Sequence, residues 1–241
     1  MIGRYYLAVV ILLTASISFL PAQFHEFDLD QIDSADYYTT PNSVIRGIGI
    51  SLGHQPLFSN DPIARMKLGL TISRPFYSLI STDNNKIVGV LPKFDFGFLV
   101  TANLIIRGSL AAYSVGNDIT RITAYGGTLF LNSTDDKPPW TINILLSQLN
   151  GPADIALRST DILFRRKYQL AGIPFFLGFG ADFYNGRATP DILSAKRFSG
   201  QTNYFYISEQ FKVGNLFSVG VHCRYHQEIV LLTIDLTREL K

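Results

Sequence analysis

Apolar and polar residues alternate one by one along most of the chain. In the stretch FSVGVHCRY, residues 217–225, Phe217, Val219 and Val221 are apolar, whereas the residues between them are small or polar. A period of two predicts a β-strand with one apolar and one polar face. The pattern predicts eleven strands, near residues 43–54, 64–79, 87–100, 104–114, 121–132, 139–149, 157–169, 174–184, 202–213, 216–225 and 228–237.

The last two predicted strands can be paired residue by residue into a hairpin. With His226 and Gln227 at its tip, Val219 lies opposite Ile234 and the apolar residues fall on one side. A slip of one residue would turn every side chain to the other face, so the two faces are well defined. His-Gln is not a favoured two-residue turn, which leaves a wider tip open.

The apolar faces of the strands are expected to contact lipid rather than a protein core. The predicted strands are about 9–14 residues long, whereas a membrane-crossing strand needs ~9–11 residues and an average globular strand has ~5–6. Aromatic residues such as Trp140, Tyr184 and Tyr225 lie near strand ends, where they suit interfacial girdles. Val221 is therefore expected to face hydrocarbon and His222 the lumen, so Val221→Arg should cost more stability than His222→Arg.

The N-terminus has the pattern of a secretory signal peptide over residues 1–22. Arg4 precedes an uncharged run over residues 5–20, and Ala22 offers a small residue for cleavage. The run falls short of the ~20 residues that a membrane-spanning helix needs. Cys223 is the single cysteine of the sequence, so an internal disulfide is excluded.

The signal peptide, the repeated alternation, the aromatic strand ends and the near-absence of cysteine together resemble Gram-negative outer-membrane β-barrel proteins. The resemblance implies an all-β fold: an antiparallel up-and-down transmembrane β-barrel over residues 43–241, located in the outer membrane. It also implies contact with outer-membrane lipid and with the outer-membrane assembly machinery. Residues 23–42 are acidic and irregular, and are expected to form an N-terminal arm, a plug or a weak first strand. Proteins of this class usually end in an aromatic residue, whereas this chain ends in Leu240 and Lys241.

The expected number of strands is about twelve, with ten as the alternative. Bacterial single-chain barrels have even strand numbers, and the pattern predicts eleven. A further strand within residues 23–42 gives twelve and places the long link at 185–201 on the outer side. Ten strands result if 157–169 is not a separate strand. Glu209 and Arg166 fall on the apolar phase, so they lie near the interface, a β-bulge shifts the phase, or their strands lie outside the membrane.

Charged residues on the polar phase of the strands are expected to face the barrel lumen. The candidate lumen-facing polar residues are Lys67, Asp95, Arg107, Asp182, His222, Arg224 and Asp235. Both signs of charge occur among them. In a narrow barrel such charges pair and fill the lumen, whereas a twelve-stranded barrel can leave a narrow pore, and the sequence leaves both arrangements open.

The sequence assigns no catalytic, cofactor-binding or metal-binding residue. Ser218, His222 and Asp235 could suggest a nucleophile–histidine–acid set. Ser218 and His222 are four residues apart on one strand, however, which separates them by ~13 Å and puts them beyond hydrogen-bond reach. The chain shows none of the usual metal-binding or nucleotide-binding spacings, and its net charge of +2 gives no strong attraction to nucleic acid.

These observations predict a non-enzymatic, integral outer-membrane barrel with a structural or accessory role in the cell envelope, where other envelope proteins could be its partners. The alternative is a narrow, porin-like passive channel. A membrane-embedded lipid-modifying enzyme and a soluble periplasmic β-barrel or sandwich are less favoured interpretations of the same pattern.

Overall fold

The computed structural model describes residues 40–59, 64–77, 90–115, 118–131, 140–150, 155–170, 173–188, 196–214 and 217–240. The expected signal peptide, residues 1–22, and residues 23–39 of the expected arm lie outside this part of the chain. The described part holds one helix, α2 (Thr40–Leu52), and ten strands. The strands are β1 (Met66–Tyr77), β2 (Leu91–Thr101), β3 (Leu104–Val115), β4 (Asp118–Leu131), β5 (Trp140–Asn150), β6 (Ile155–Leu170), β7 (Ile173–Ala188), β8 (Lys196–Val213), β9 (Phe217–His226) and β10 (Ile229–Leu240).

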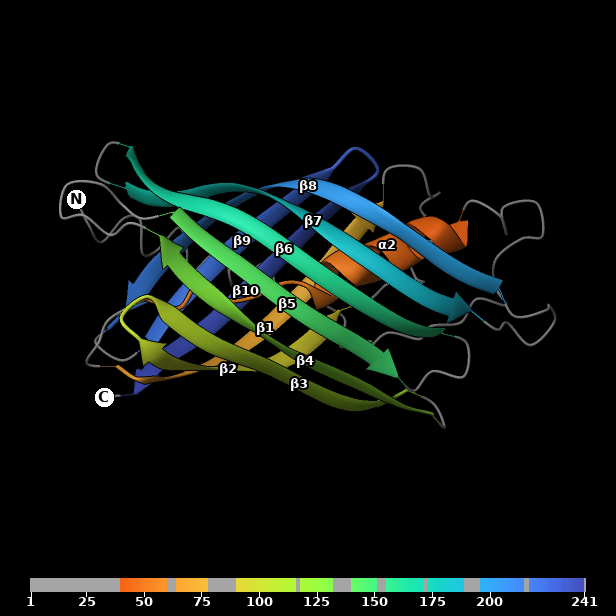
Figure 1. Ribbon diagram of the computed structural model, residues 1–241, viewed down its shortest axis with the longest axis horizontal. Coiled ribbons are helices and arrows are strands. Elements are labelled where there is room, and N and C mark those ends of the chain that lie inside the picture. Colours follow the sequence, from red (N-terminus) through yellow and green to blue (C-terminus); the bar gives the residue numbers. More distant parts are fainter. Residues whose placement is uncertain are drawn as a thin grey trace.

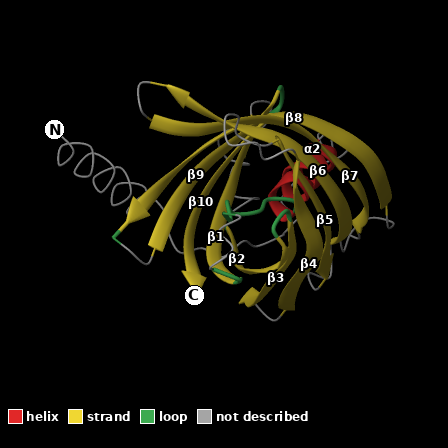
Figure 2. Cartoon of the chain, turned by 60° about the vertical axis from the view of Figure 1, so that its left-hand side comes forward, coloured by secondary structure: helices red, strands yellow, loops and turns green. Residues whose placement is uncertain are grey.

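The ten strands close into a barrel. Each strand pairs antiparallel with the next, and β1 pairs with β10 (Figure 1). The predicted up-and-down barrel is thereby confirmed, with the alternative number of ten strands. The reasoning that led to ten strands was wrong, however. Residues 157–169 do form a strand, β6, whereas most of residues 43–54, which were expected to form a strand, belong to the helix. Helix α2 lies inside the barrel (Figure 2).

The barrel has two distinct ends. Met66 pairs with Leu240, so β1 begins and β10 ends at the same end, called the C-terminal end. The links at this end comprise residues 102–103, 132–139, 171–172 and 214–216. The links at the opposite end, called the helix end, comprise residues 78–90, 116–117, 151–154, 189–195 and 227–228. Much of the long link expected at 185–201 is therefore strand, since β7 extends to Ala188 and β8 starts at Lys196.

Residues 40–59 run through the lumen from one end to the other. At the helix end, Arg46 of α2 forms an ion pair of 2.6 Å with Glu228, which lies in the turn between β9 and β10. At the other end, the main-chain N–H of Ser59 donates a hydrogen bond of 3.1 Å to Glu239. Residues 40–59 are called the plug, and the inward faces of the ten strands are called the wall.

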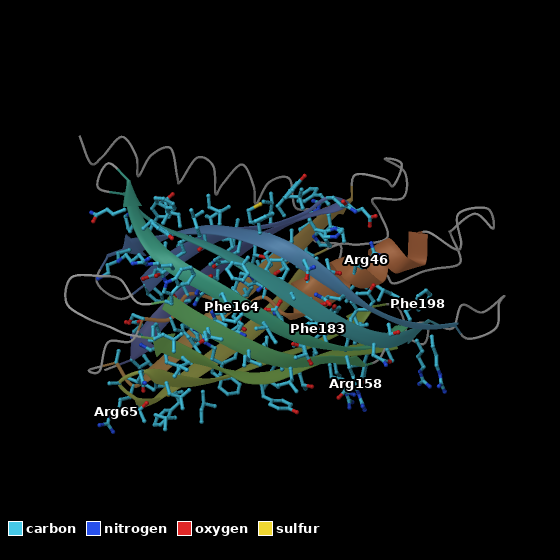
Figure 3. The ribbon with its side chains drawn as sticks, turned by 45° about the horizontal axis from the view of Figure 1, so that its top comes forward. Arg46, Arg65, Arg158, Phe164, Phe183 and Phe198 are labelled. Carbon is cyan, nitrogen blue, oxygen red and sulfur yellow. The ribbon has the colours of Figure 1, made fainter. Side chains whose placement is uncertain are left out.

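The outer surface of the barrel is apolar around its circumference. Large apolar side chains are exposed on it, among them Leu70, Phe96, Ile106, Ile144, Phe179, Phe205 and Leu232. An apolar surface of this extent is not tolerated in water, whereas a closed barrel leaves no unpaired strand edge and can span a bilayer. Val221 is 36% exposed and His222 is 1% exposed, so Val221 lies on the outer face of β9 and His222 on its inner face. Phe164 and Phe183 on the outer surface are labelled in Figure 3.

The β9–β10 hairpin has the predicted faces in a different register. Val219 pairs with Leu236 rather than with Ile234, and the turn consists of Gln227 and Glu228. The pairing is thus shifted by two residues from the expected one. A shift of two preserves the face of every side chain, which explains how the faces were predicted correctly from the wrong register.

The two charged residues that fall on the apolar phase of their strands, Arg166 and Glu209, lie on the outer side of the barrel, as the alternation indicates. Arg166 lies over the rings of Trp140 and Tyr168, at 5.7 and 5.8 Å from their centroids. This aromatic pair places Arg166 in the girdle at the C-terminal end, where an amphipathic side chain can reach the interface. Glu209 pairs with Phe175, near the start of β7, and the pairing of β8 with both neighbours is continuous. A bulge therefore does not explain Glu209.

The plug forms a helix because its apolar residues can all be buried at once inside the wall. Ile45, Ile48 and Leu52 recur at helical spacing, and all three are buried. Glycine allows the helix to approach the strands closely, since a Cβ at Gly49 would collide with the carboxylate of Asp182. Within the described part of the chain, no helix is long and apolar enough to cross a bilayer.

Candidate functional site

The lumen near the helix end is lined with apolar side chains that cover α2. Ile45, Ile48, Ile50 and Leu52 of the plug belong to one buried cluster with residues of the wall. The wall contributes Leu91, Ile122, Leu149, Leu157, Leu163, Tyr184, Phe198, Tyr204, Tyr206, Ile229 and Leu231. Burying apolar side chains stabilises the seated plug by ~25 cal/mol per Å² of covered apolar area. This layer was not predicted from the sequence, and the expectation that Tyr184 lies in an interfacial girdle was wrong, because its side chain is buried in the lumen.

Two buried cations of the wall bind carbonyl groups near the end of α2, and Lys93 is the first of them. Lys93 donates to the carbonyl oxygens of Ser51, Leu52 and His54 at 3.1, 3.0 and 2.9 Å. The last carbonyl groups of a helix have no partner within the helix, and they carry the negative end of its dipole. A buried ammonium group at this position therefore satisfies these acceptors and stabilises the end of the helix.

Arg224, the second cation, links the plug to strands β6 and β8 of the wall. Its guanidinium donates to the carbonyl oxygens of Ile50 and Gly53, both at 3.0 Å, and to the carboxylate of Asp161 at 3.0 Å. Tyr204 donates to the same carboxylate at 2.6 Å, and its ring lies 4.6 Å from the guanidinium carbon. Arg224 and Asp161 are buried, and such a pair is stable only when its remaining hydrogen bonds are made.

His222 and Asp235 form a second buried pair on the wall. Nε2 of His222 contacts Oδ2 of Asp235, and Nδ1 of His222 lies 2.8 Å from the hydroxyl of Tyr206. The expected register had placed His222 opposite Leu231, which is wrong, since His222 pairs with Thr233. Asp235 lies across from Gly220. A Cβ at Gly220 would lie 2.5 Å from Nε2 of His222, so the pair requires glycine there.

The other four expected lumen residues are also buried and contact the wall or the plug. Lys67 pairs with Glu239 at 3.2 Å. Asp95 accepts hydrogen bonds from Thr71 and Ser109, both at 2.5 Å. Arg107 donates to the carbonyl of Pro56 at 2.6 Å and lies over the ring of Phe58 at 4.6 Å. Asp182 accepts a hydrogen bond from Ser159. The seven residues therefore lie in the lumen together, although a plug formed by residues 43–59, which most of them surround, was not predicted.

The arrangement holds a polypeptide segment inside the lumen. Among the hydrogen bonds of the described residues, Ser218 contributes its main-chain carbonyl, to Thr237. It therefore adds no nucleophile to the His222–Asp235 pair. A separate cavity of about 500 Å³ lies near the helix end, lined by Gln148, Asn150, Ala156, Leu157, Arg158, Asn185, Gly186, Arg187, Arg197, Phe198 and Ser199. Figure 3 shows Arg158 and Phe198 towards this end and Arg65 at the other.

The closed ten-stranded barrel with an apolar exterior and a filled interior defines an integral outer-membrane β-barrel protein. A scan against protein-family models finds no match, and no curated protein sequence is significantly similar to the chain.

Three solved structures illustrate the likeness to other barrels. The translocator domain of the autotransporter NalP from Neisseria meningitidis has a TM-score of 0.39 and 5% identity, covering 86% of this chain and 97% of that chain. Neisserial surface protein A has a TM-score of 0.31 and 8% identity, covering 73% and 96%. Ail, the attachment invasion locus protein of Yersinia pestis, has a TM-score of 0.28 and 9% identity, covering 73% and 95%. TM-scores below 0.5 do not assign a family or a function.

Proposed function

We propose that the protein is a permanently plugged outer-membrane barrel with a structural or accessory role in the envelope, rather than a passive channel. The observation that supports this most directly is the set of buried wall cations bound to the main chain of the plug. Lys93, Arg224 and Arg107 donate to carbonyl oxygens between Ile50 and Pro56. Lipid surrounds the barrel, and the assembly machinery and other envelope proteins are its proposed partners.

Release of the plug would leave these cations in the lumen without their acceptors. Hydrogen bonds to charged groups contribute about 1.5–3 kcal/mol each. Further bonds reach the plug from Ser147, which donates to Leu52, and from Gln210, which donates to Leu57. The bonds are distributed along the depth of the lumen, so partial displacement would not open a continuous path.

A non-enzymatic role is part of the same proposal. The His222–Asp235 pair is the arrangement in the lumen that most resembles part of a catalytic set, and its two residues are 1% and 0% exposed. Lipid lies on the other side of the strands, and the plug covers the pair from the lumen. A lipid substrate therefore has no access to the imidazole while the plug is seated.

The test of the closed lumen is conductance in planar bilayers. The refolded full chain is expected to show no stable channel steps, because the plug extends through the lumen. A variant lacking residues 40–58 is expected to conduct, since the polar wall is then open to water. A heat-shift gel checks that the deletion variant has folded. Steady conductance of the intact chain would contradict the proposal and support the porin-like alternative.

We also propose that the helix end faces the outside of the cell, because the longest link, at 78–90, lies there and outer-membrane barrels have short periplasmic turns. Ala195, in the link that suggested this orientation, lies outside the described residues, whereas Ser199 is exposed in β8 near the same end. In a Cys223→Ser background, Ser199→Cys is expected to react with an impermeant thiol reagent on intact cells. Arg65→Cys, at the C-terminal end, should react only after the outer membrane is permeabilised. The opposite pattern would reverse the orientation.

A further inference from the structure

Three buried side chains meet at the contact between the plug and the wall. They are His54 of the plug, His222 of β9 and Asp235 of β10, and one ligand atom from each lies within 4.8 Å of the others. The rings of His54 and His222 are 4.6 Å apart, at an interplanar angle of 69°. Imidazole nitrogens and a carboxylate oxygen are the donor types that Zn²⁺ and similar transition metals take in proteins.

The hydrogen bonds of this cluster are incomplete. Among the described residues, neither ring nitrogen of His54 has a hydrogen-bond partner, although the side chain is fully buried. Oδ1 of Asp235 also lacks a partner in this part of the chain. A buried polar atom without a partner costs about 1–3 kcal/mol, so an unsatisfied imidazole beside a histidine and a carboxylate calls for a ligand.

His222 is already oriented as a metal ligand would be. Its Nδ1 is held by the hydroxyl of Tyr206 at 2.8 Å, which directs Nε2 towards Asp235. A metal-binding histidine usually bonds through its second nitrogen in this way, which fixes the ring. Gly220 keeps the space beside Nε2 open, since a Cβ there would lie 2.5 Å from Nε2 and 2.7 Å from Oδ2 of Asp235.

We propose that His54, His222 and Asp235 bind one divalent transition-metal ion of the Zn²⁺ type. Nε2 of His222, a carboxylate oxygen of Asp235 and one nitrogen of His54 supply three ligands, with the fourth position left for water. The proton shared between His222 and Asp235 is released to solvent when the ion binds. With bond lengths of ~2.0–2.2 Å, ligand atoms on one ion lie roughly 3.3–3.5 Å apart. The His54 nitrogen must therefore approach by about 1–1.5 Å, through rotation of its unbonded ring, whereas Nε2 of His222 and Oδ2 of Asp235, which are in hydrogen-bond contact, must move apart to admit the ion.

The ion would fasten the plug to the wall, because one ligand lies on the plug and two lie on adjacent strands. This clamping role rests on the plugged barrel proposed above, whereas metal binding itself does not. The site is enclosed by the wall and the plug, so the ion is expected to enter while the barrel folds. Arg224 and Lys93 donate to the carbonyl groups of Gly53 and His54, and Arg165 donates to the Tyr206 hydroxyl that contacts His222, so these three cations lie close by. The site should therefore retain only ions that bind nitrogen strongly.

The test is refolding of the full chain with Co²⁺ as a spectroscopic probe, followed by dialysis and measurement of bound metal. We expect one equivalent per chain, with visible absorption typical of Co²⁺ bound by nitrogen and oxygen. His54→Ala and Gly220→Ala should lower the affinity at least tenfold. The matched control is His226→Ala, since His226 is a half-buried histidine at the end of the same strand, and this variant should keep the full equivalent.

Two results would overturn the site. One is a folded wild-type chain, verified by heat-shift gel, that retains no cobalt after dialysis. The other is cobalt retained equally by wild type and His54→Ala, which would mean adventitious binding elsewhere. Should His54→Ala fail to fold, His54→Gln provides the same comparison with a polar side chain. Conductance is measured independently of metal content. A folded barrel that binds no metal and conducts no current would therefore contradict the metal site but not the proposed plug.

Discussion

Replacing Arg224 by alanine is expected to destabilise the folded barrel by about 3–5 kcal/mol. Removal of one partner of a buried ion pair leaves the other charge without compensation, and losses of this size result. Here the loss is compounded, because Arg224 binds Asp161 and also the carbonyl groups of Ile50 and Gly53. The measurement is urea unfolding of the refolded protein in lipid vesicles.

Arg238→Ala is the matched control for this experiment. Arg238 lies in β10 on the outer face, where its guanidinium sits 5.5 Å from the ring of Phe217. An exposed cation–π contact contributes about 0.5–1 kcal/mol, so this variant should unfold almost like wild type. Equal losses of unfolding free energy in the two variants would show that Arg224 does not hold the plug in place.

The strands and their faces could be predicted because the bilayer imposes one rule on every strand. Most outward residues within the hydrocarbon must be apolar, so the alternation appears directly in the sequence, as in Val230, Leu232 and Ile234. The register could not be predicted in the same way. A shift of two residues leaves the faces unchanged, and the apolar pairs of the last hairpin are equally matched in both registers.

The plug was predicted as a strand because its own sequence alternates. In residues 44–52, VIRGIGISL, small residues separate Ile48, Ile50 and Leu52. This spacing fits the period of two of a strand, and it also allows these residues to be buried around a helix. The sequences of the strands did indicate that an apolar segment fills the lumen. Leu145, Ile229 and Leu231 occupy the polar phase and are buried in the lumen, and apolar side chains there require an apolar partner inside.

The lumen residues could be predicted individually, but their contacts could not. Arg224 and Asp161 are 63 residues apart, and nothing in the alternation relates one strand to a distant one. The assumption of a hydrated lumen also fails at His222, which is packed against Tyr206, Asp235 and His54. His222→Arg is therefore expected to be costly, contrary to the expectation from the pattern alone.

Ile144→Arg is expected to destabilise the barrel by about 2–4 kcal/mol, because it places a guanidinium at the middle of the bilayer. Ile144 is exposed on the outer face of β5, between Trp140 at one strand end and Gln148 near the other. Val221→Arg, the substitution that the alternation first suggests, should cost less. Val221 pairs with Glu209 on the adjacent strand, so the new cation can pair with this carboxylate.

A double-mutant cycle in lipid vesicles separates the two contributions. In a Glu209→Gln background, Val221→Arg should become as costly as Ile144→Arg, while the cost of Ile144→Arg should not change. The difference between the two backgrounds measures the pairing of the introduced guanidinium with the Glu209 carboxylate within the hydrocarbon, where few water molecules compete. The contrary result is that Val221→Arg costs equally little unfolding free energy in both backgrounds. This result would mean that Val221 lies at the membrane interface rather than at mid-depth. The apolar band would then be centred closer to the middle of β5 than to the middle of β9.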